Sequence, residues 1–261
     1  MIDAIGVFDS GVGGLTVVSA LRQRLPGESI LYLGDTARLP YGSKSPATVT
    51  RYTQRSIDFL TERGVKAVVV ACNTASALGL PNLQKVDVPP WGVIEPGAKK
   101  AAAVSRGKVG VIATEATVRS DAYPRALRAL RPDLEIVSKA CPLFVPLVEE
   151  GWHDDSITEQ VAERYLRPLF DAGIDTLVLG CTHYPLLKPV LQRVAGPGVA
   201  LVDSAEEGAE MVAAGLEAGH IEATQEAGHH FCVTDAGETF QRIARRILQD
   251  PGVTLEWVEV T

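Results

Sequence analysis

An internal repeat is the feature that most constrains this chain. GVKAVVVACNT at 64–74 aligns without a gap on GIDTLVLGCTH at 173–183, which places Cys181 on Cys72, 109 residues earlier. IGVFDS at 5–10 aligns in the same way on VGVIAT at 109–114, so that Ser10 falls on Thr114. Two homologous halves are the simplest interpretation, and each half must then fold into the same kind of unit.

Short aliphatic runs alternate with amphipathic stretches of helical period, which is typical of βα units around a parallel sheet. Strands that are apolar throughout are buried on both faces, as parallel strands usually are. The expected strands are AIGVF (4–8), ILYLG (30–34), AVVVA (67–71), KVGVIA (108–113), EIVS (135–138), TLVLG (176–180) and VALVD (199–203). The sequence therefore predicts an α/β fold, with a helix and a last strand in the tail.

The segment VPPWGVIEPG at 88–97 is the expected crossing between the halves, because it is rich in Pro and Gly. A helix after the strand at 199–203 would return the chain to the first half. We predict one domain at 1–97 plus 207–261, carrying Cys72, and a second at 98–206, carrying Cys181. The predicted fold is a pair of pseudo-symmetric flavodoxin-like domains with mainly parallel sheets and an active site in the cleft between them.

Charge and composition exclude several classes of function. The net charge is -7 and no Lys/Arg-rich run is visible, which argues against nucleic-acid binding. No secretory signal and no apolar run of the ~20 residues that span a bilayer are visible, so we expect a cytoplasmic protein with no membrane partner. The four cysteines form no CxxC pair, and this argues against a disulfide framework and against zinc.

Cys72 and Cys181 each follow an apolar strand, and ligands gather at the carboxyl ends of parallel strands. A lone buried cysteine is usually only a small hydrophobe, which is the interpretation we keep for Cys141 and Cys232. Two cysteines at equivalent places in two halves, each followed by small polar residues, favour a chemical role instead.

Three titratable residues are candidates to support these cysteines. His183 lies two positions after Cys181 and titrates near neutral pH, although it could equally be a core histidine bonded to the backbone. Asp9 could serve the other cysteine. Glu149 follows an apolar run and could reach the cleft, although glutamates at such positions are more often solvated.

Two loops and a set of neutral polar residues could hold a small ligand. DSGVGGLTV at 9–17 is a glycine-rich strand-to-helix turn of the kind that lets backbone N–H groups approach an anion, and LGDTARLPYGSKS at 33–45 is a rigid loop. Either could also be a simple turn or surface loop. The hydroxyl and amide candidates, each of which alone is more often a helix cap, are Ser10, Asn73, Thr74, Thr114, Thr117 and Thr182.

Two thiols brought from two halves to opposite sides of one cleft suit a near-symmetric reaction. If one thiolate removes a proton from a carbon and one thiol delivers a proton to the opposite face, the stereocentre is inverted. A cysteine with an unperturbed pKa near 8.5 needs only a modest shift to serve in either state, and nearby donors or helix N-termini can provide it.

Seven motifs carry a resemblance to a known family: FDSGVGGL, YLGDTARLPYG, VVACNTASA, GVIEPG, ATEATVRSDAY, CPLFVPLVEEG and LVLGCTHYPLL. In this order, between about residue 5 and about residue 205, they resemble the glutamate racemases of the aspartate/glutamate racemase superfamily. The resemblance implies cofactor-independent interconversion of L- and D-glutamate, without pyridoxal phosphate or metal. It also implies D-glutamate supply for peptidoglycan in a bacterial cytoplasm, and a homodimer.

The same resemblance implies roles for individual residues. Cys72 and Cys181 would be the two catalytic bases, acting on D-glutamate and L-glutamate respectively, although the sequence itself does not order them. Asp9 and His183 would support them, and Glu149 would assist near His183. The implied substrate-binding residues are Asp9, Ser10, Pro40, Tyr41, Gly42, Asn73, Thr74, Thr114, Thr117, Thr182 and His183.

Three alternatives stay open at this point. An aspartate or hydantoin racemase of the same fold would show the same paired cysteines. A thiol hydrolase would use one cysteine with His183 as base and leave the other dispensable. A carboxylate-binding or partner-binding module would keep affinity but never exchange a substrate proton.

Overall fold

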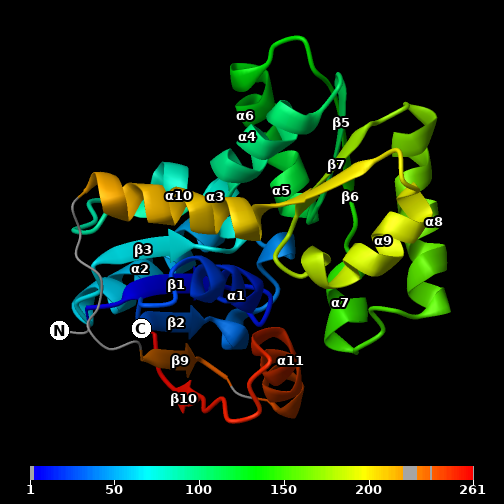
Figure 1. Cartoon of the computed structure of the whole chain (residues 1–261). Coiled ribbons are helices and arrows are strands. Elements are labelled where there is room, and N and C mark those ends of the chain that lie inside the picture. Colours follow the sequence, from blue (N-terminus) through cyan, green and yellow to red (C-terminus); the bar gives the residue numbers. More distant parts are fainter. Residues whose placement is uncertain (1–2, 220–227, 236, 261) are drawn as a thin grey trace.

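The computed structural model describes residues 3–219, 228–235 and 237–260. Parts of the predicted first domain, namely residues 1–2, 220–227, 236 and 261, lie outside the described residues. The described chain forms two parallel sheets, each covered by helices on both faces (Figure 1).

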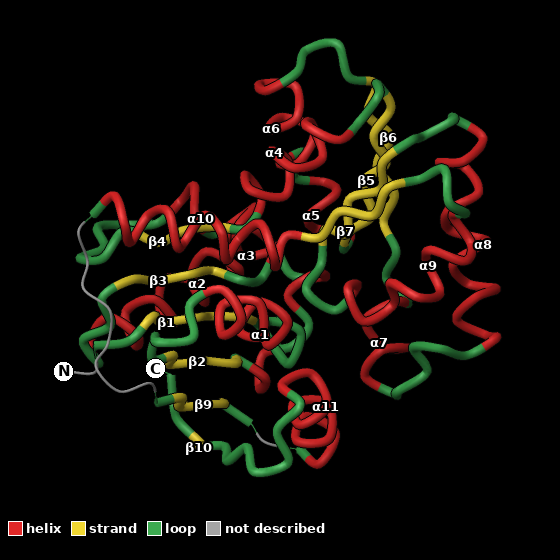
Figure 2. The backbone as a smooth tube through the Cα atoms, viewed as in Figure 1, coloured by secondary structure: helices red, strands yellow, loops and turns green. Residues whose placement is uncertain are grey.

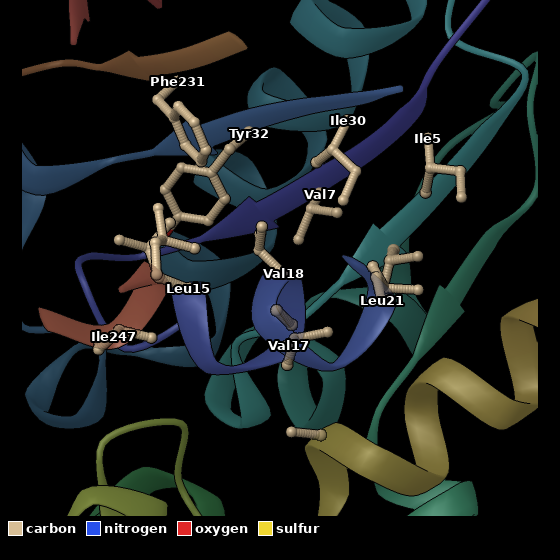
Figure 3. Close-up of a cluster of buried hydrophobic side chains, with 14 of the residues drawn as sticks. Ile5, Val7, Leu15, Val17, Val18, Leu21, Ile30, Tyr32, Phe231 and Ile247 are labelled. Atoms are coloured by element: carbon tan, nitrogen blue, oxygen red, sulfur yellow. The ribbon is translucent and has the colours of Figure 1, made fainter. Parts of the chain in front are cut away.

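The larger sheet has the strand order β10-β9-β2-β1-β3-β4, and neighbouring strands run parallel. Its strands are β1 (Ile5–Asp9), β2 (Ile30–Gly34), β3 (Ala67–Val70), β4 (Pro90–Gly92), β9 (His229–Val233) and β10 (Glu256–Trp257). One face packs against α1 (Leu15–Arg24), α10 (Ser204–Ala218) and α11 (Glu238–Leu248), and the other against α2 (Pro46–Glu62) and α3 (Asn73–Leu78). Figure 3 shows the first of these cores, where α1 side chains meet Val7, Ile30 and Tyr32.

The smaller sheet, which Figure 2 shows apart from the larger one, has the order β6-β5-β7-β8. Its strands are also parallel. They are β5 (Lys108–Ala113), β6 (Glu135–Ala140), β7 (Thr176–Gly180) and β8 (Ala200–Asp203). One core contains residues of α4 (Ile94–Val104) and α6 (Ala122–Leu130), and the other those of α7 (Phe144–Glu149), α8 (Ser156–Asp171) and α9 (Lys188–Ala195). The remaining short elements are α5 (Glu115–Arg119) and the 3-10 turns η1 (Thr36–Arg38), η2 (Tyr41–Ser43), η3 (Leu80–Asn82) and η4 (Tyr184–Leu187).

The sequence repeat is a structural repeat. The order β2-β1-β3-β4 recurs as β6-β5-β7-β8, which is the flavodoxin-like arrangement that the sequence predicted. The register recurs too, because Ile5 pairs with Ala67 in the first sheet and Val109 pairs with Thr176 in the second. These pairs are equivalent in the repeat alignment, so the two cysteines follow equivalent strands at equivalent heights.

The helix before each cysteine-bearing strand ends in the same way. Gly64 follows α2 with φ of 76° and Gly173 follows α8 with φ of 77°. A residue with a Cβ atom is strained at such a left-handed angle, and glycine is the usual end of a helix for that reason. The same turn therefore feeds both β3 and β7.

All seven predicted strands are confirmed, with ends that agree within two residues, and the tail contains the predicted helix α11 and last strand β10. Two strands were missed. β4 lies inside the predicted crossing segment. It is an edge strand that begins with a proline, and proline is not expected in a central strand. β9 was missed because it begins with His229 and His230 and has no aliphatic run. Only its last three residues are buried.

The chain passes between the sheets twice, from β4 into α4 and from β8 into α10. The predicted domain limits at 97/98 and 206/207 lie close to these two crossings and stay a prediction. Within the described ranges, no helix combines the length and the apolarity needed to cross a bilayer.

Candidate active site

Cys72 lies directly before α3 and is 5% exposed. Its thiol donates to Oγ of Ser10 over 3.5 Å, a contact that arises because β1 and β3 are neighbouring strands whose carboxyl ends meet. Burial, with the nearby Asp9 carboxylate, raises the pKa of the Cys72 thiol to about 12. At neutral pH this cysteine is therefore a proton donor.

Cys181 follows β7 and is 7% exposed. Its Sγ lies 3.9 Å from Nδ1 of His183, and Nε2 of that ring lies 3.2 Å from Oε1 of Glu149 at the end of α7. Burial lowers the pKa of His183, but the contacts with Cys181 and Glu149 outweigh it and raise the pKa to about 10. His183 is therefore a cation at neutral pH, and its charged ring lies beside Sγ of Cys181.

Asp9 joins the two halves at the centre of the site. Its Oδ1 accepts from the backbone N–H of Gly11 at 2.9 Å, and its Oδ2 accepts from the Thr182 hydroxyl at 3.2 Å, from the other half. The side chain is fully buried, and this burial raises its pKa to about 6 despite the opposing influence of cationic His183. The carboxyl group thus titrates close to physiological pH, near both cysteines.

The glycine-rich turn and the 33–45 loop touch the second half so closely that side chains are excluded. A Cβ on Gly13 would lie 2.4 Å from Oγ1 of Thr182 and 2.5 Å from Nδ1 of His183. A Cβ on Gly42 would lie 2.7 Å from Cβ of Thr114. These glycines allow the halves to close on each other, a role that the sequence analysis did not assign to them.

Three threonines from the two halves form a closed triangle of hydroxyl groups. Oγ1 of Thr74, which follows Cys72 by two residues, lies 2.9 Å from Oγ1 of Thr114 and 3.0 Å from Oγ1 of Thr117. The Thr114 and Thr117 hydroxyls are themselves 2.9 Å apart. The Thr114 hydroxyl also accepts from the Thr117 backbone N–H and so caps α5. Thr114 is therefore both a helix cap and a member of the hydroxyl triangle.

Asn73, next to Cys72, is buried, and its two amide atoms differ in their surroundings. Oδ1 accepts a 2.6 Å hydrogen bond from the hydroxyl of Tyr123 on α6. Nδ2 has no hydrogen-bond partner among the residues that the structure describes. The amide therefore has a donor left over within the site.

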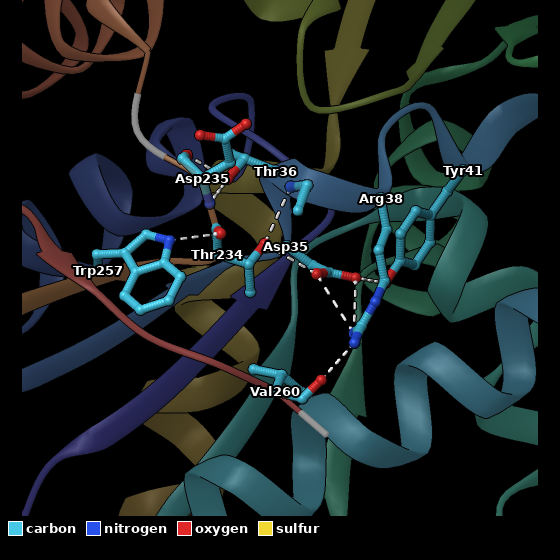
Figure 4. Close-up of polar contacts among 9 residues, drawn as sticks. Asp35, Thr36, Arg38, Tyr41, Thr234, Asp235, Trp257 and Val260 are labelled. Carbon is cyan, nitrogen blue, oxygen red and sulfur yellow. Dashed lines mark hydrogen bonds and ion pairs between the residues drawn. The ribbon is translucent and has the colours of Figure 1, made fainter.

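The loop around Tyr41 is held by a polar cluster, shown in Figure 4. The Tyr41 hydroxyl donates to Oδ2 of buried Asp35 at 2.6 Å, and Oδ1 of Asp35 accepts from Thr234 at 3.0 Å. The ring of Tyr41 packs in the same core cluster as Cys72. Its hydroxyl is committed to Asp35, so contact with a ligand would use its main chain.

The rest of this loop lies at the mouth of the site. Pro40 is exposed and Gly42 half-buried, and both line a pocket of about 210 Å³ together with Thr114, Cys141 and Glu149. The structure thus brings the sequence-predicted residues of both halves to one interdomain region, with Pro40 at its edge.

Two residues of this region were not singled out from the sequence, although both lie inside quoted motifs. Asp35 is in YLGDTARLPYG and Tyr123 ends ATEATVRSDAY. The other two cysteines, Cys141 and Cys232, are buried in hydrophobic clusters as expected for core residues. In the described part of the chain, no three His, Cys, Asp or Glu side chains are grouped so that they could hold a metal ion.

Comparisons with known proteins identify the family of this chain. The family model for Asp/Glu/Hydantoin racemase matches residues 14–212. A glutamate racemase of Geobacter metallireducens is 54% identical over 249 residues, which cover 94% of this chain and 92% of that protein. Two crystal structures are similar over 99% of this chain and 98% of theirs. Glutamate racemase isoform RacE1 of Bacillus anthracis has a TM-score of 0.94 and 41% sequence identity. The glutamate racemase of Francisella tularensis in complex with D-glutamate has a TM-score of 0.92 and 38% sequence identity. This chain belongs to the Asp/Glu/hydantoin racemase family.

Proposed function

We propose that this protein is a glutamate racemase that interconverts L- and D-glutamate with two cysteines as acid and base and without a cofactor. The observation that carries the proposal is the placement of Cys72 and Cys181 after equivalent strands of two repeated halves, buried in one interdomain site. The relatives at high identity are named glutamate racemases, which supports glutamate as the substrate rather than aspartate or a hydantoin.

In the direction from L- to D-glutamate, the Cys181 thiolate removes the α-proton, so the C–H bond breaks and an S–H bond forms. The electron pair stays on the α-carbon and spreads into its carboxylate. The Cys72 thiol then gives its proton to the opposite face, which leaves Cys72 as thiolate. In the reverse direction the two cysteines exchange these roles. The resemblance orders them in this way, and burial, which keeps Cys72 protonated at neutral pH, supports Cys72 as the proton donor in this direction.

The carbanion-like transition state must be stabilised by the protein alone. Neutral donors that are already in place, in a site from which water is excluded, stabilise such charge best. The N–H of Asn73 that has no partner among the described residues is a donor of this kind. The threonine hydroxyls come from both halves and bond to one another, and they would turn to the ligand when it binds. Asp9 and the His183–Glu149 pair would set the charge around the two sulfurs.

We assign substrate binding to the residues that meet between the halves. The carboxylates and the ammonium of glutamate would contact Asp9, Ser10, Pro40, Tyr41, Gly42, Asn73, Thr74, Thr114, Thr117, Thr182 and His183. Tyr41 would take part through its backbone because its hydroxyl bonds to Asp35.

The test is proton NMR of L-glutamate and, separately, D-glutamate in deuterated water, with metal-stripped and pyridoxal-free protein and with optical rotation followed in parallel. Loss of the α-proton signal with matching decay of rotation is the expected result. Exchange with aspartate but not glutamate would mean that the substrate is wrong, and binding without exchange would favour a carboxylate-binding module.

Single cysteine replacements separate the racemase from a thiol hydrolase. Cys72→Ser and Cys181→Ser should each reduce racemisation by about 1,000-fold or more, because each proton transfer needs its own group. Cys232→Ser is the matched control, since Cys232 lies in the core on the first half. A hydrolase would tolerate the loss of Cys72 and still cleave its substrate with Cys181 and His183.

We further propose that the product serves peptidoglycan synthesis in the cytoplasm and that the protein forms a homodimer. Complementation of a bacterial strain that requires D-glutamate would test the first, and sedimentation equilibrium would test the second. Failure to complement while the purified protein racemises glutamate would refute the cellular role alone.

A further inference from the structure

Tyr123 is a buried tyrosine whose surroundings are shaped to receive it. The side chain comes from α6 in the second half and is 1% exposed. Two glycines make room for its ring. A Cβ on Gly180, the residue before Cys181, would lie 2.9 Å from its Cε2, and a Cβ on Gly97 would lie 3.3 Å from its hydroxyl oxygen. The ring is therefore confined beside the strand that carries one of the two reactive cysteines.

The hydroxyl of the same tyrosine reaches the neighbour of the other cysteine. It donates to Oδ1 of Asn73 at 2.6 Å, across the boundary between the halves. Burial raises the pKa of Tyr123, so the phenol keeps its proton and its role as donor at any physiological pH. Tyr123 thus contacts residues directly beside Cys72 and directly beside Cys181.

This hydrogen bond decides which way the Asn73 amide faces. A phenol that donates must meet the amide oxygen, so Nδ2 is directed elsewhere, and there it has no partner among the described residues. A buried N–H without a partner destabilises the folded protein, which is tolerated where a ligand supplies the acceptor. Without the tyrosine hydroxyl the amide could turn over and present its oxygen to that ligand instead.

We propose that Tyr123 is a positioning residue that fixes the Asn73 amide so that Nδ2 donates to a carboxylate of the bound substrate. The inference rests on the proposed function, because it takes the ligand at Asn73 to be glutamate. Tyr123 itself acts through Asn73 and does not touch the substrate. Because the tyrosine comes from the second half and Asn73 from the first, the donor is oriented only when the halves are closed.

A double-mutant cycle tests this assignment. Tyr123→Phe keeps the ring and removes only the hydroxyl, and it should raise KM for D-glutamate roughly 10-fold with a smaller change in kcat. Asn73→Ala should raise KM at least as much. If Tyr123 acts through Asn73, the double variant should match Asn73→Ala within about 2-fold, because the second change removes nothing more. Multiplying effects would overturn the proposal.

Tyr165→Phe is the control, since its hydroxyl lies in the same half at 3.4 Å from the Leu143 backbone N–H. It should leave KM unchanged. If Tyr123→Phe fails to fold, Asn73→Asp provides the test, because Asp retains an oxygen for Tyr123 but replaces the free N–H by a second oxygen. Asn73→Asp should abolish the rise in Tm that D-glutamate gives the wild type, and an unchanged rise would overturn the proposal. A wild-type protein without racemase activity would instead refute the proposed function.

Discussion

Replacement of Gly13 by alanine should separate the two halves of the site while each half stays folded. The new Cβ would lie 2.4 Å from Oγ1 of Thr182 and 2.5 Å from Nδ1 of His183, whereas ordinary contacts begin near 3.4 Å. Rotation of Thr182 could relieve the first contact only. The His183 ring is buried and held by Glu149, so the second contact requires a shift of about 1 Å between the halves.

A shift between the halves would break a hydrogen bond that crosses the boundary between them. The Thr182–Asp9 hydrogen bond is already 3.2 Å long, and a further ~1 Å of separation would break it. A misplacement of reacting groups by about 1 Å costs roughly 100-fold in rate. We therefore expect kcat/KM to fall about 100-fold. Stability should fall by about 1–3 kcal/mol at most, because overpacking at the boundary leaves the core of each half intact.

The assay is optical rotation of L-glutamate with the variant and the wild type, alongside denaturant unfolding of both. Gly27→Ala is the matched control, because a Cβ on Gly27 would meet no atom within 4 Å. Activity of Gly13→Ala within about 3-fold of the wild type would refute the argument, since it would mean that the halves need not approach this closely for catalysis.

Two further predictions concern charge and hydroxyl groups in the site. The pKa of Asp9 is raised from 3.8 to about 6, so its ionisation penalises the folded state as pH rises through that window. The penalty is absent below it and complete above it. Asp9→Asn should therefore raise the unfolding free energy at pH 8 by about 1–3 kcal/mol and should not raise it near pH 3.5. Racemisation should fall at least ~10-fold. A loss of stability at pH 8 would contradict this prediction. Thr74→Val should raise KM about 10-fold, because it removes the hydroxyl that bonds to both Thr114 and Thr117, whereas Thr61→Val on α2 should not alter KM.

The sequence was sufficient to predict most of the strands and the equivalent placement of the two cysteines, because both depend on local pattern and on the repeat. Apolar runs identify strands that are buried on both faces, and the aligned repeat places Cys72 and Cys181 after equivalent strands. β9 was not predicted because it starts with two histidines and has no such run. It lies next to the edge strand β10. Local pattern is informative only where burial is continuous along the chain.

Contacts between distant residues were beyond this kind of reasoning. The sequence suggested Tyr41 as a binding residue, but it could not show that the hydroxyl is occupied by Asp35, whose buried carboxylate needs donors. Tyr123 and Asn73 are 50 residues apart and come from different halves. Only the closed arrangement of the two sheets shows that they meet.

The repeat duplicates the position of the cysteine but not its partners, and this difference has a chemical purpose in the proposed mechanism. Cys72 faces the hydroxyl of Ser10, whereas Cys181 faces the cationic ring of His183. If both thiols had identical surroundings, a single proton would be shared between them, and half of the molecules would present the wrong base to a given enantiomer. Burial keeps Cys72 protonated at neutral pH, and Cys181 has the cationic ring of His183 beside it. These differences cannot make the enzyme favour one direction, because enantiomers in water are equally stable and kcat/KM must then be equal for both. The asymmetry of the site can therefore appear only as kcat and KM values that differ together between the two enantiomers.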